Sequence, residues 1–256
     1  MQYKSLIKAA AAAALFVASS SQALTTYSED FNAMNAADGA ALGAGGGNWK
    51  IFANVFDGSG GYKFGYGVFD APNGGPGFSA VASGEGAGGP SDQYINTYSD
   101  YNCCGAGTTN EGHFNGTDRV EANIFQEQVV GAGDAGVWRF EFDAKLPGGA
   151  PLGANTTAAA FIKVLDPDLG FATTIFLQND STTLTDSAWE TRFIDITIDG
   201  SMAGDILQFG FINTSENFEN TGVYYDNVSF AAIPVPAAVW LFGSAIAGLF
   251  AARRRR

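Results

Sequence analysis

The feature that most constrains this chain is a two-residue alternation of apolar and polar side chains, repeated in short runs separated by Gly, Asn, Asp and Pro. In one run Trp138, Phe140 and Phe142 alternate with charged residues. Successive side chains of a β-strand point to opposite faces, so the run predicts a strand with one buried and one solvated face. The same reasoning predicts nine strands: Thr25–Phe31, Trp49–Val55, Arg119–Val129, Val137–Asp143, Ala158–Leu165, Ala172–Gln178, Arg192–Asp199, Ile206–Ile212 and Val223–Phe230.

Nine short strands without a long amphipathic helix predict an all-β fold, a two-sheet antiparallel sandwich formed by residues 24–232. About 209 residues suffice for one such domain with a single core. Residues 57–90 depart from the pattern, because 12 of these 34 residues are glycine. Glycine at this density costs backbone entropy, so we expect long ordered loops with a short hairpin there. A ligand-binding lid is the alternative for this segment.

The first 23 residues have the pattern of a signal peptide. Lys4 and Lys8 precede the apolar run Ala9–Ala18, and Ser21-Gln22-Ala23 places small residues at the two positions that a signal peptidase reads. We expect cleavage after Ala23. A permanent N-terminal anchor is the alternative, but the apolar run is too short to span a bilayer.

The C-terminal residues 233–256 combine a proline pair, an apolar run and four arginines. The 20 residues from Ile233 to Ala252 carry no charge. As a helix they would span about 30 Å, the thickness of a bilayer core. Arg253, Arg254, Arg255 and Arg256 would hold the C-terminus in the cytoplasm and leave the upstream chain outside. A buried helix of a soluble domain is disfavoured by these arginines and by the lack of a polar face.

This tail resembles the PEP-CTERM sorting signals of Gram-negative bacteria. The match is to the variant Val-Pro-Leu-Pro-Ala type: Pro234, Val235 and Pro236 form the motif, with Val235 where the commonest form has Glu, and Trp240-Leu241-Phe242-Gly243-Ser244 follows. The resemblance implies cleavage near the prolines by an exosortase-type membrane protease. It implies an inner-membrane intermediate and then transfer to the cell envelope or extracellular matrix of bacteria that make exopolysaccharide.

The charge of residues 24–232 restricts the partners of the exported part. It contains 26 acidic and seven basic residues, a net charge of −19. Such a surface repels nucleic acid and anionic lipid, and it disfavours an acidic polysaccharide unless cations bridge the two. Neutral polysaccharide and divalent ions remain compatible with it.

The closing segment Gly222–Phe230 places Asp226 on the predicted strand face of Tyr224, Val228 and Phe230. A carboxylate among apolar neighbours needs hydrogen-bond donors or a cation. The segment resembles the last strand of carbohydrate-binding-module jelly rolls of the galactose-binding-like type, where this aspartate helps to hold a structural Ca²⁺. The resemblance implies a jelly-roll topology and a Ca²⁺ site at Asp226 with Glu29 or Asp30. The alternative is that Asp226 accepts hydrogen bonds from loop amides without a metal.

Cys103 and Cys104 are adjacent and are the two cysteines of the chain. A disulfide between neighbours closes a strained ring, so an ordinary structural disulfide is excluded. A vicinal disulfide, bonds to another chain and free thiols remain open. A metal site with His113 is disfavoured, because the spacing matches no standard zinc pattern.

The sequence carries no catalytic signature. No Glu-x-Asp-x-x-Glu run of laminarinase-like jelly rolls is present, and His113 is the one histidine available as a base. We therefore expect a non-catalytic protein that binds glycan through exposed aromatic residues; a polysaccharide hydrolase or lyase is the alternative. The candidates for stacking on sugar rings are Trp49, Tyr62, Tyr66 and Trp189, and Trp138 is assigned to the core.

Overall fold

The computed structural model describes residues 23–34, 49–71, 78–99, 118–216 and 219–234. These residues form twelve strands and two short 3-10 helices, η2 (Pro167–Leu169) and η3 (Gly200–Met202). The strands are β1 (Tyr27–Glu29), β2 (Lys50–Phe56), β3 (Tyr62–Asp70), β4 (Ser79–Ser83), β5 (Gln93–Thr97), β6 (Arg119–Val129), β7 (Gly136–Lys145), β8 (Thr157–Asp166), β9 (Ala172–Asp180), β10 (Glu190–Ile198), β11 (Ile206–Glu216) and β12 (Val223–Ala232).

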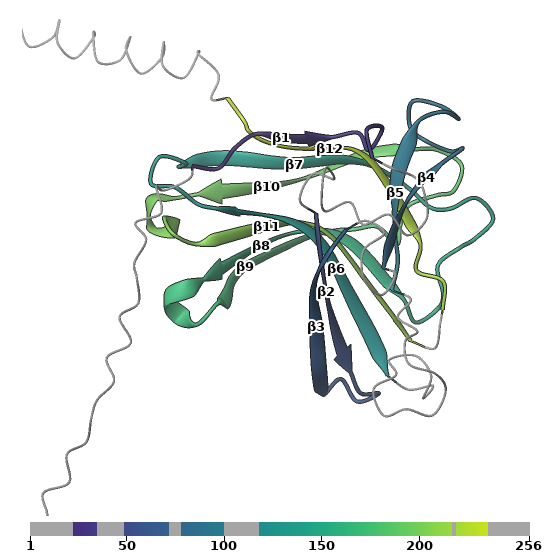
Figure 1. Cartoon of the computed structure of the whole chain (residues 1–256), viewed down its shortest axis with the longest axis horizontal. Coiled ribbons are helices and arrows are strands. Elements are labelled where there is room, and N and C mark those ends of the chain that lie inside the picture. Colours follow the sequence, from purple (N-terminus) through teal and green to yellow (C-terminus); the bar gives the residue numbers. More distant parts are fainter. Residues whose placement is uncertain (1–22, 35–48, 72–77, 100–117, 217–218, 235–256) are drawn as a thin grey trace, which may run out of the picture.

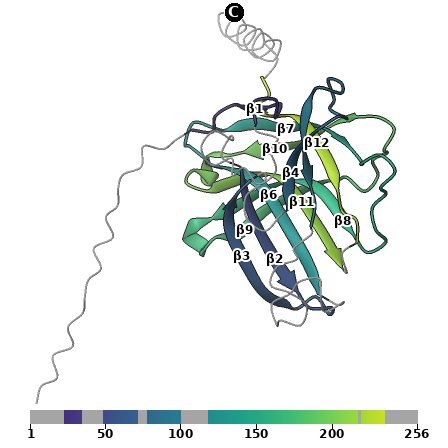
Figure 2. The same ribbon diagram turned by 45° about the vertical axis from the view of Figure 1, so that its right-hand side comes forward.

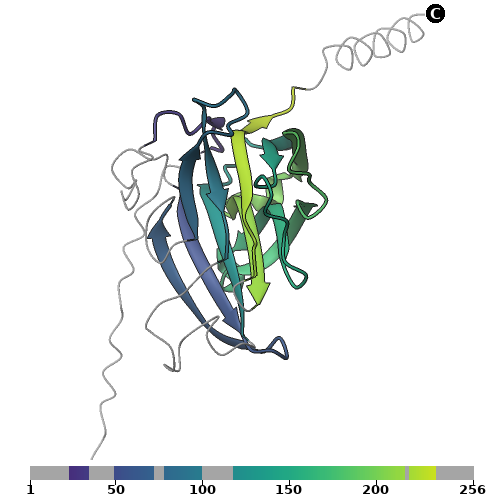
Figure 3. The same cartoon turned by 90° about the vertical axis from the view of Figure 1, so that its right-hand side faces the viewer.

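The strands pair into two antiparallel sheets that pack face to face (Figure 1). Sheet A has the order β10-β7-β12-β5-β4, with β1 paired to β12; sheet B has the order β3-β2-β6-β11-β8-β9. In sheet B the β2–β3 and β8–β9 hairpins lie on opposite sides of the molecule, dark blue and green in Figures 1 and 3. The predicted all-β two-sheet antiparallel sandwich is confirmed, and all nine predicted strands are present.

Aromatic side chains from both sheets fill the space between them. Phe209 of β11 stacks on Phe230 of β12, with ring centroids 4.5 Å apart, and Phe211 stacks on Tyr225 at 3.6 Å. Trp138 is also buried, as predicted. Burial of this apolar area is the main stabilising contribution to the sandwich.

The expectation for the glycine-rich segment 57–90 was wrong in part, because it contains the nine-residue strand β3 and the strand β4. The glycines of β3 serve packing. A Cβ on Gly65 would lie 2.8 Å from the ring of Phe52, so the absence of a side chain lets this ring lie over the strand. Period-two patterning does not detect such a strand, since glycine carries no hydrophobic signal.

The predicted facing of the last strand was also wrong. A β-bulge between Asp226 and Ser229 shifts the register of β12 against β7, and Asn227 has a φ of 47°. As a result Tyr225, rather than Tyr224, shares the core face with Val228 and Phe230. Asp226 then points away from the core, toward the connection between β4 and β5, where the backbone N–H of Ala87 donates to it.

Several predicted features fall outside the described residues. They are the signal peptide up to residue 22, Cys103, Cys104 and His113, and the sorting signal from Val235 onward, including Arg253, Arg254, Arg255 and Arg256. Pro234 is described and follows β12 directly. Within the part of the chain that the structure describes, no helix has the length and apolar character needed to cross a membrane. Figure 2 shows β12 and β1 side by side where β12 ends.

Candidate functional site

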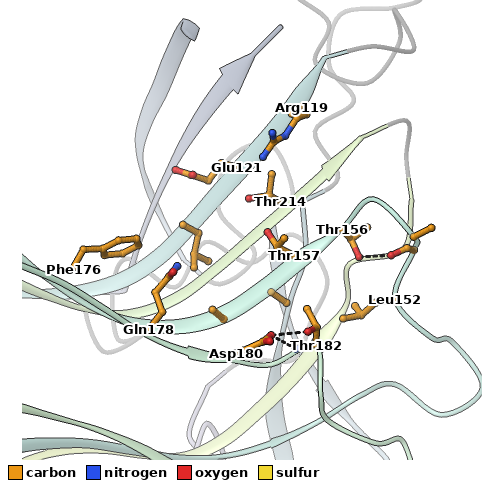
Figure 4. Close-up of a pocket in the computed structure, with 15 residues that line it drawn as sticks. Arg119, Glu121, Leu152, Thr156, Thr157, Phe176, Gln178, Asp180, Thr182 and Thr214 are labelled. Atoms are coloured by element: carbon orange, nitrogen blue, oxygen red, sulfur yellow. Dashed lines mark hydrogen bonds between the residues drawn. The ribbon is translucent and has the colours of Figure 1, made fainter. Parts of the chain in front are cut away.

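The outer face of sheet B is hollow along its length. All six of its strands contribute to one hollow of about 270 Å³, which is lined by Val68 on the edge strand β3 and by Thr173 on the opposite edge strand β9. Because both edge strands reach the same hollow, the sheet curls around it. A second hollow of about 800 Å³ follows along β6, β11, β8 and β9 (Figure 4). We call this outer face of sheet B, with both hollows, the trough.

The floor of the trough is apolar. Phe125, Gly210 and Phe161 lie side by side on β6, β11 and β8. The two rings are almost fully buried although they face away from the sandwich core. A Cβ on Gly210 would lie 2.0 Å from the carbonyl oxygen of Ile124, so glycine is required there and the floor stays low between the rings.

Side-chain amides and carboxylates line the floor at both sides. Glu121 accepts hydrogen bonds from Asn54 at 3.0 Å and from Asn123 at 3.1 Å. Glu127 accepts one from Gln208 at 2.9 Å. Figure 4 shows Arg119 and Glu121 on β6 across the second hollow from Gln178 and Asp180 on β9. Such fixed amide and carboxylate groups suit hydrogen bonds to hydroxyl groups.

Lys163 crosses the floor of the trough. It starts on β8, and its ammonium lies 3.4 Å from Oδ1 of Asn123 on β6, two strands away. The ammonium also lies 5.1 Å from the ring centroid of Phe161 and 5.4 Å from that of Phe176, which is within cation–π range. Burial lowers the pKa of Lys163, and the nearby charge of Glu121 acts in the opposite direction.

Exposed aromatic rings rise from the walls of the trough. Phe176 on β9 is 44% exposed, and Phe52 on β2 is half-buried. Tyr62 is 63% exposed and packs edge-on against Phe56. Both flank the β2–β3 turn on the outward side of the sheet, so Tyr62 extends the trough at one end.

The predicted stacking residues are therefore not gathered in one site. Trp49 is 1% exposed and stacks on Phe211 inside the core, so its prediction as a ligand-binding residue was wrong. Trp49 directly precedes β2, whose alternate residues Ile51, Ala53 and Val55 are buried, and its indole continues this inward face. The side chain of Tyr66 lies outside the described residues. Trp189 is half-buried on the side of sheet A, where its Nε1 donates to the carbonyl oxygen of Glu85.

The predicted metal ligands Glu29, Asp30 and Asp226 do not converge. Within the described segments no three acidic, His or Cys side chains form a group that could hold a metal ion. Pairing of β1 with β12 places Glu29 opposite Val228, and its carboxylate accepts the backbone N–H of Phe31 at 2.9 Å. Asp30 accepts the backbone N–H of Asn32 at 3.0 Å.

Asp226 instead pairs with Asp92, which the sequence analysis did not single out. Asp92 lies close enough to Asp226 for its charge to act on that carboxyl group, and Asp92 accepts 2.5 Å and 2.6 Å bonds from Asn32 Nδ2 and from the backbone N–H of Gly88. Asp92 thus lies between the segment that follows β1, which contains Asn32, and strand β12, which contains Asp226. Burial, with Asp92 adding to it, raises the pKa of Asp226 to about 7, although amide donors from Ala87 and Asn227 oppose this.

The trough residues were not predicted, because the outward positions of the strands were assumed to be exposed to solvent. A signal was present, since Phe52, Phe125, Phe161 and Phe176 occupy outward positions where polar residues are the rule. Several aromatic residues on the solvated face of neighbouring strands indicate a binding face.

No protein-family model matches the chain, and no curated protein matches it. Solved structures to which it is similar include the xylan-binding CBM22-1 domain of Paenibacillus barcinonensis Xyn10C, at 12% identity and a TM-score of 0.36, covering 61% of this chain and 81% of that one. The tandem CBM22-1-CBM22-2 domain of the same protein gives 12% identity and a TM-score of 0.42, covering 85% and 47%. A cyclase from Fischerella sp. TAU gives 15% identity and a TM-score of 0.37, covering 61% and 75%.

Proposed function

We propose that this chain is an exported, non-catalytic jelly-roll protein of the bacterial envelope or extracellular matrix that binds polysaccharide in the trough. The observation that carries the proposal is an open, curved surface with exposed phenyl rings on its walls and fixed amides beside its floor. Sugar rings stack on aromatic faces through their C–H groups, and their hydroxyls pair with amides and carboxylates. Phe52 and Phe176 would carry the stacking, and Asn123 and Gln208 the hydrogen bonds.

The placement of carboxylates supports a binding role over hydrolysis. Glu121 and Glu127 are six residues apart on β6, about 20 Å along the strand. Glu121 and Asp180 are separated by β11 and β8, about 14 Å along the sheet. Glycosidase carboxylates lie roughly 5–10 Å apart. Glu216 is a nearer neighbour of Glu121, but it is paired with Arg119 at 3.6 Å and does not line the hollows.

The experiment is a glycan-array screen of the full chain in detergent micelles, followed by titration and by an assay for release of reducing ends. We expect saturable binding to one class of polysaccharide without cleavage. Absence of binding to any glycan would contradict the binding role, and release of reducing ends would favour the hydrolase or lyase.

Export and sorting rest on the two terminal segments. Signal peptidase would cut after Ala23, and an exosortase-type protease would cut near Pro234 and Pro236. Replacing both prolines by alanine in the native host is expected to leave a chain of higher mass in the membrane fraction. Equal masses for the two chains would contradict sorting.

We propose a structural Ca²⁺ at the carboxyl pair Asp226 and Asp92. Asp226 is buried, and the half-buried Asp92 lies beside it. Two neighbouring carboxyl groups favour a shared proton or a cation, and Ca²⁺ takes oxygen ligands. The amide nitrogen of Asn32 donates to Asp92, and its Oδ1 accepts the backbone N–H of Gln93, so Asn32 fixes the position of the Asp92 carboxylate. Ca²⁺ is expected to raise the melting temperature over that in a chelator, and a midpoint unaffected by the chelator would contradict the site.

A further inference from the structure

The basic residues of the sandwich divide into two groups. All seven between residues 24 and 232 lie within the described residues. Five of them form ion pairs with carboxylates: Lys63, Arg119, Arg139, Lys145 and Arg192. The other two, Lys50 and Lys163, have no described carboxylate oxygen within 4.0 Å.

Lys50 and Lys163 line the same hollow of the trough. Lys50 starts on β2, next to Phe125 on β6. Lys163 comes from the other side and reaches Asn123 on β6. To reach Asn123, the side chain of Lys163 crosses β11, on which Gly210 has no side chain to obstruct it. The two lysines therefore line this hollow from strands on opposite sides of it.

An unpaired ammonium in this position is costly. Lys163 is half-buried, and its single hydrogen bond in the described residues is long, so most of its donor capacity is unused. A desolvated cation without a counter-ion loses hydration free energy that an ion pair would offset. In a domain with 26 acidic residues, five of the seven basic side chains form ion pairs with carboxylates. The other two lie where a ligand would bind.

Carboxylates also lie near this pair, but among the described side chains none forms an ion pair with either ammonium. Glu127 lines the same hollow, the charge of Glu121 acts on Lys163, and Asp70, opposite Lys50 on β3, has a side chain outside the described residues. Glu127 is bound by Gln208, and Glu121 is bound by Asn54 and Asn123. Asp180 lies on β9 in the second hollow, where its carboxylate accepts the backbone N–H and hydroxyl of Thr182. The net charge of −19 disfavours acidic polymers on average, but charges more than about 10 Å away are screened at physiological salt.

We propose that Lys50 and Lys163 bind a carboxylate of the polysaccharide, so that the trough selects a chain containing uronic acid residues over its neutral counterpart. The inference rests on the proposed function and narrows its ligand class. The aromatic walls would stack on the sugar rings, and the two ammonium groups would take the acidic group. The sequence-based expectation of a neutral ligand came from the net charge of the whole domain, whereas this proposal rests on the two lysines that line the hollow.

The test compares polygalacturonate and alginate with their carboxyl-reduced forms in titrations of the full chain in detergent micelles. The wild-type chain is expected to bind at least one acidic polymer about tenfold or more tighter than its reduced form. The double variant Lys50→Met with Lys163→Met should lose this preference and retain its affinity for the reduced polymer within about threefold. The conservative double variant Lys50→Arg with Lys163→Arg should restore the preference. Arg139→Met, which removes a cation from the outer face of sheet A, should leave the ratio unchanged.

Four outcomes would overturn the inference. Equal affinity of the wild-type chain for acidic and reduced polymers, with both lost in Phe176→Ala, would retain the proposed function and remove the carboxylate site. A preference that survives the Lys-to-Met changes would assign it to another surface. Tighter binding of poly-glutamate than of any polygalacturonate would indicate an acidic peptide partner. Absence of binding to every polymer would overturn the proposed function as well.

Discussion

The outer faces of the two sheets arrange their charged residues in different ways. On sheet A, Arg139 donates to both carboxylate oxygens of Asp195, at 2.7 and 2.9 Å, and its guanidinium lies 3.8 Å from the ring centroid of Phe193. On sheet B, Lys163 lies over aromatic rings without a carboxylate partner among the described residues. Both faces combine cations with aromatic rings, but only the first satisfies its cation internally. The difference supports the proposal that a ligand binds in the trough rather than on sheet A.

The largest expected effect concerns the floor of the trough. Gly210→Ala should lower the free energy of unfolding by about 3 kcal/mol, because the new Cβ would overlap the carbonyl oxygen of Ile124 and the strands would have to separate. Denaturant titration measures this. Gly200→Ala is the control, since a Cβ there meets nothing within 4 Å. An equal effect of the two changes would mean that the close approach of β11 and β6 is not real.

The next largest effect is on polysaccharide affinity, which should depend on aromatic rings of sheet B and not on those of sheet A. Removing both trough rings in Phe52→Ala with Phe176→Ala should weaken polysaccharide binding by about 1–3 kcal/mol, which is about fivefold to over a hundredfold. Titration calorimetry with the polysaccharide selected by the array measures it. Phe193→Ala removes an equally exposed ring from sheet A, 48% exposed against 44% for Phe176, and should leave the affinity unchanged. The reverse result would move the site to sheet A.

A moderate effect is expected for the carboxyl pair. The folded-state pKa of Asp226 is raised from 3.8 to about 7, so the stability that its neutral form contributes is fully present below about pH 4 and is lost as the pH rises through 7. In chelator, the melting temperature should fall by a few degrees between pH 5 and pH 8. Asp226→Asn should flatten this slope, and Asp195→Asn should not. Ca²⁺ should stabilise the protein more at pH 8 than at pH 5, because it competes with the shared proton.

A wild-type slope that Asp226→Asn leaves intact would assign the pH dependence to other groups. Asp57, Asp92, Asp195 and Asp199 have lowered pKa values, mainly through hydrogen bonds to their carboxylates. Their stabilising contributions are lost only as the pH falls through those lowered values. They therefore do not produce a loss of stability between pH 5 and pH 8.

The smallest effect is expected on sheet A. Arg139→Met removes a solvent-screened ion pair and should leave the free energy of unfolding almost unchanged. Thermal melting measures it, and the affinity for polysaccharide should stay the same. A large loss of binding would show that the two faces are not independent.

The sequence predicted the strands wherever side chains carried the alternation. Phe140 and Phe142 predicted β7 correctly, because each faces the core and has charged neighbours in the sequence. The same rule failed for β3, where Gly65 accommodates the ring of Phe52, and for β12, where a bulge after Asp226 moved Tyr225 into the core. Glycine and bulges change the facing of residues without changing their hydropathy.

The site was less predictable than the fold for a different reason. Trp49 and Phe176 are both aromatic residues of predicted strands, yet one is buried between the sheets and the other is exposed on a wall of the trough. Which face is curved depends on how six strands pair, and pairing is a long-range property. Asp92 was missed likewise, because only the β4–β5 connection brings it to Asp226.

Hydroxyl-radical footprinting of the full chain, with and without the bound polysaccharide, tests the central claim most directly. Binding in the trough predicts that oxidation of Phe52, Phe176 and Tyr62 slows. Phe193 and Leu169, which are exposed outside the trough, should keep their rates. Protection of Phe193, with Phe52 and Phe176 oxidised as fast as in the free protein, would contradict the assignment of the trough as the binding site.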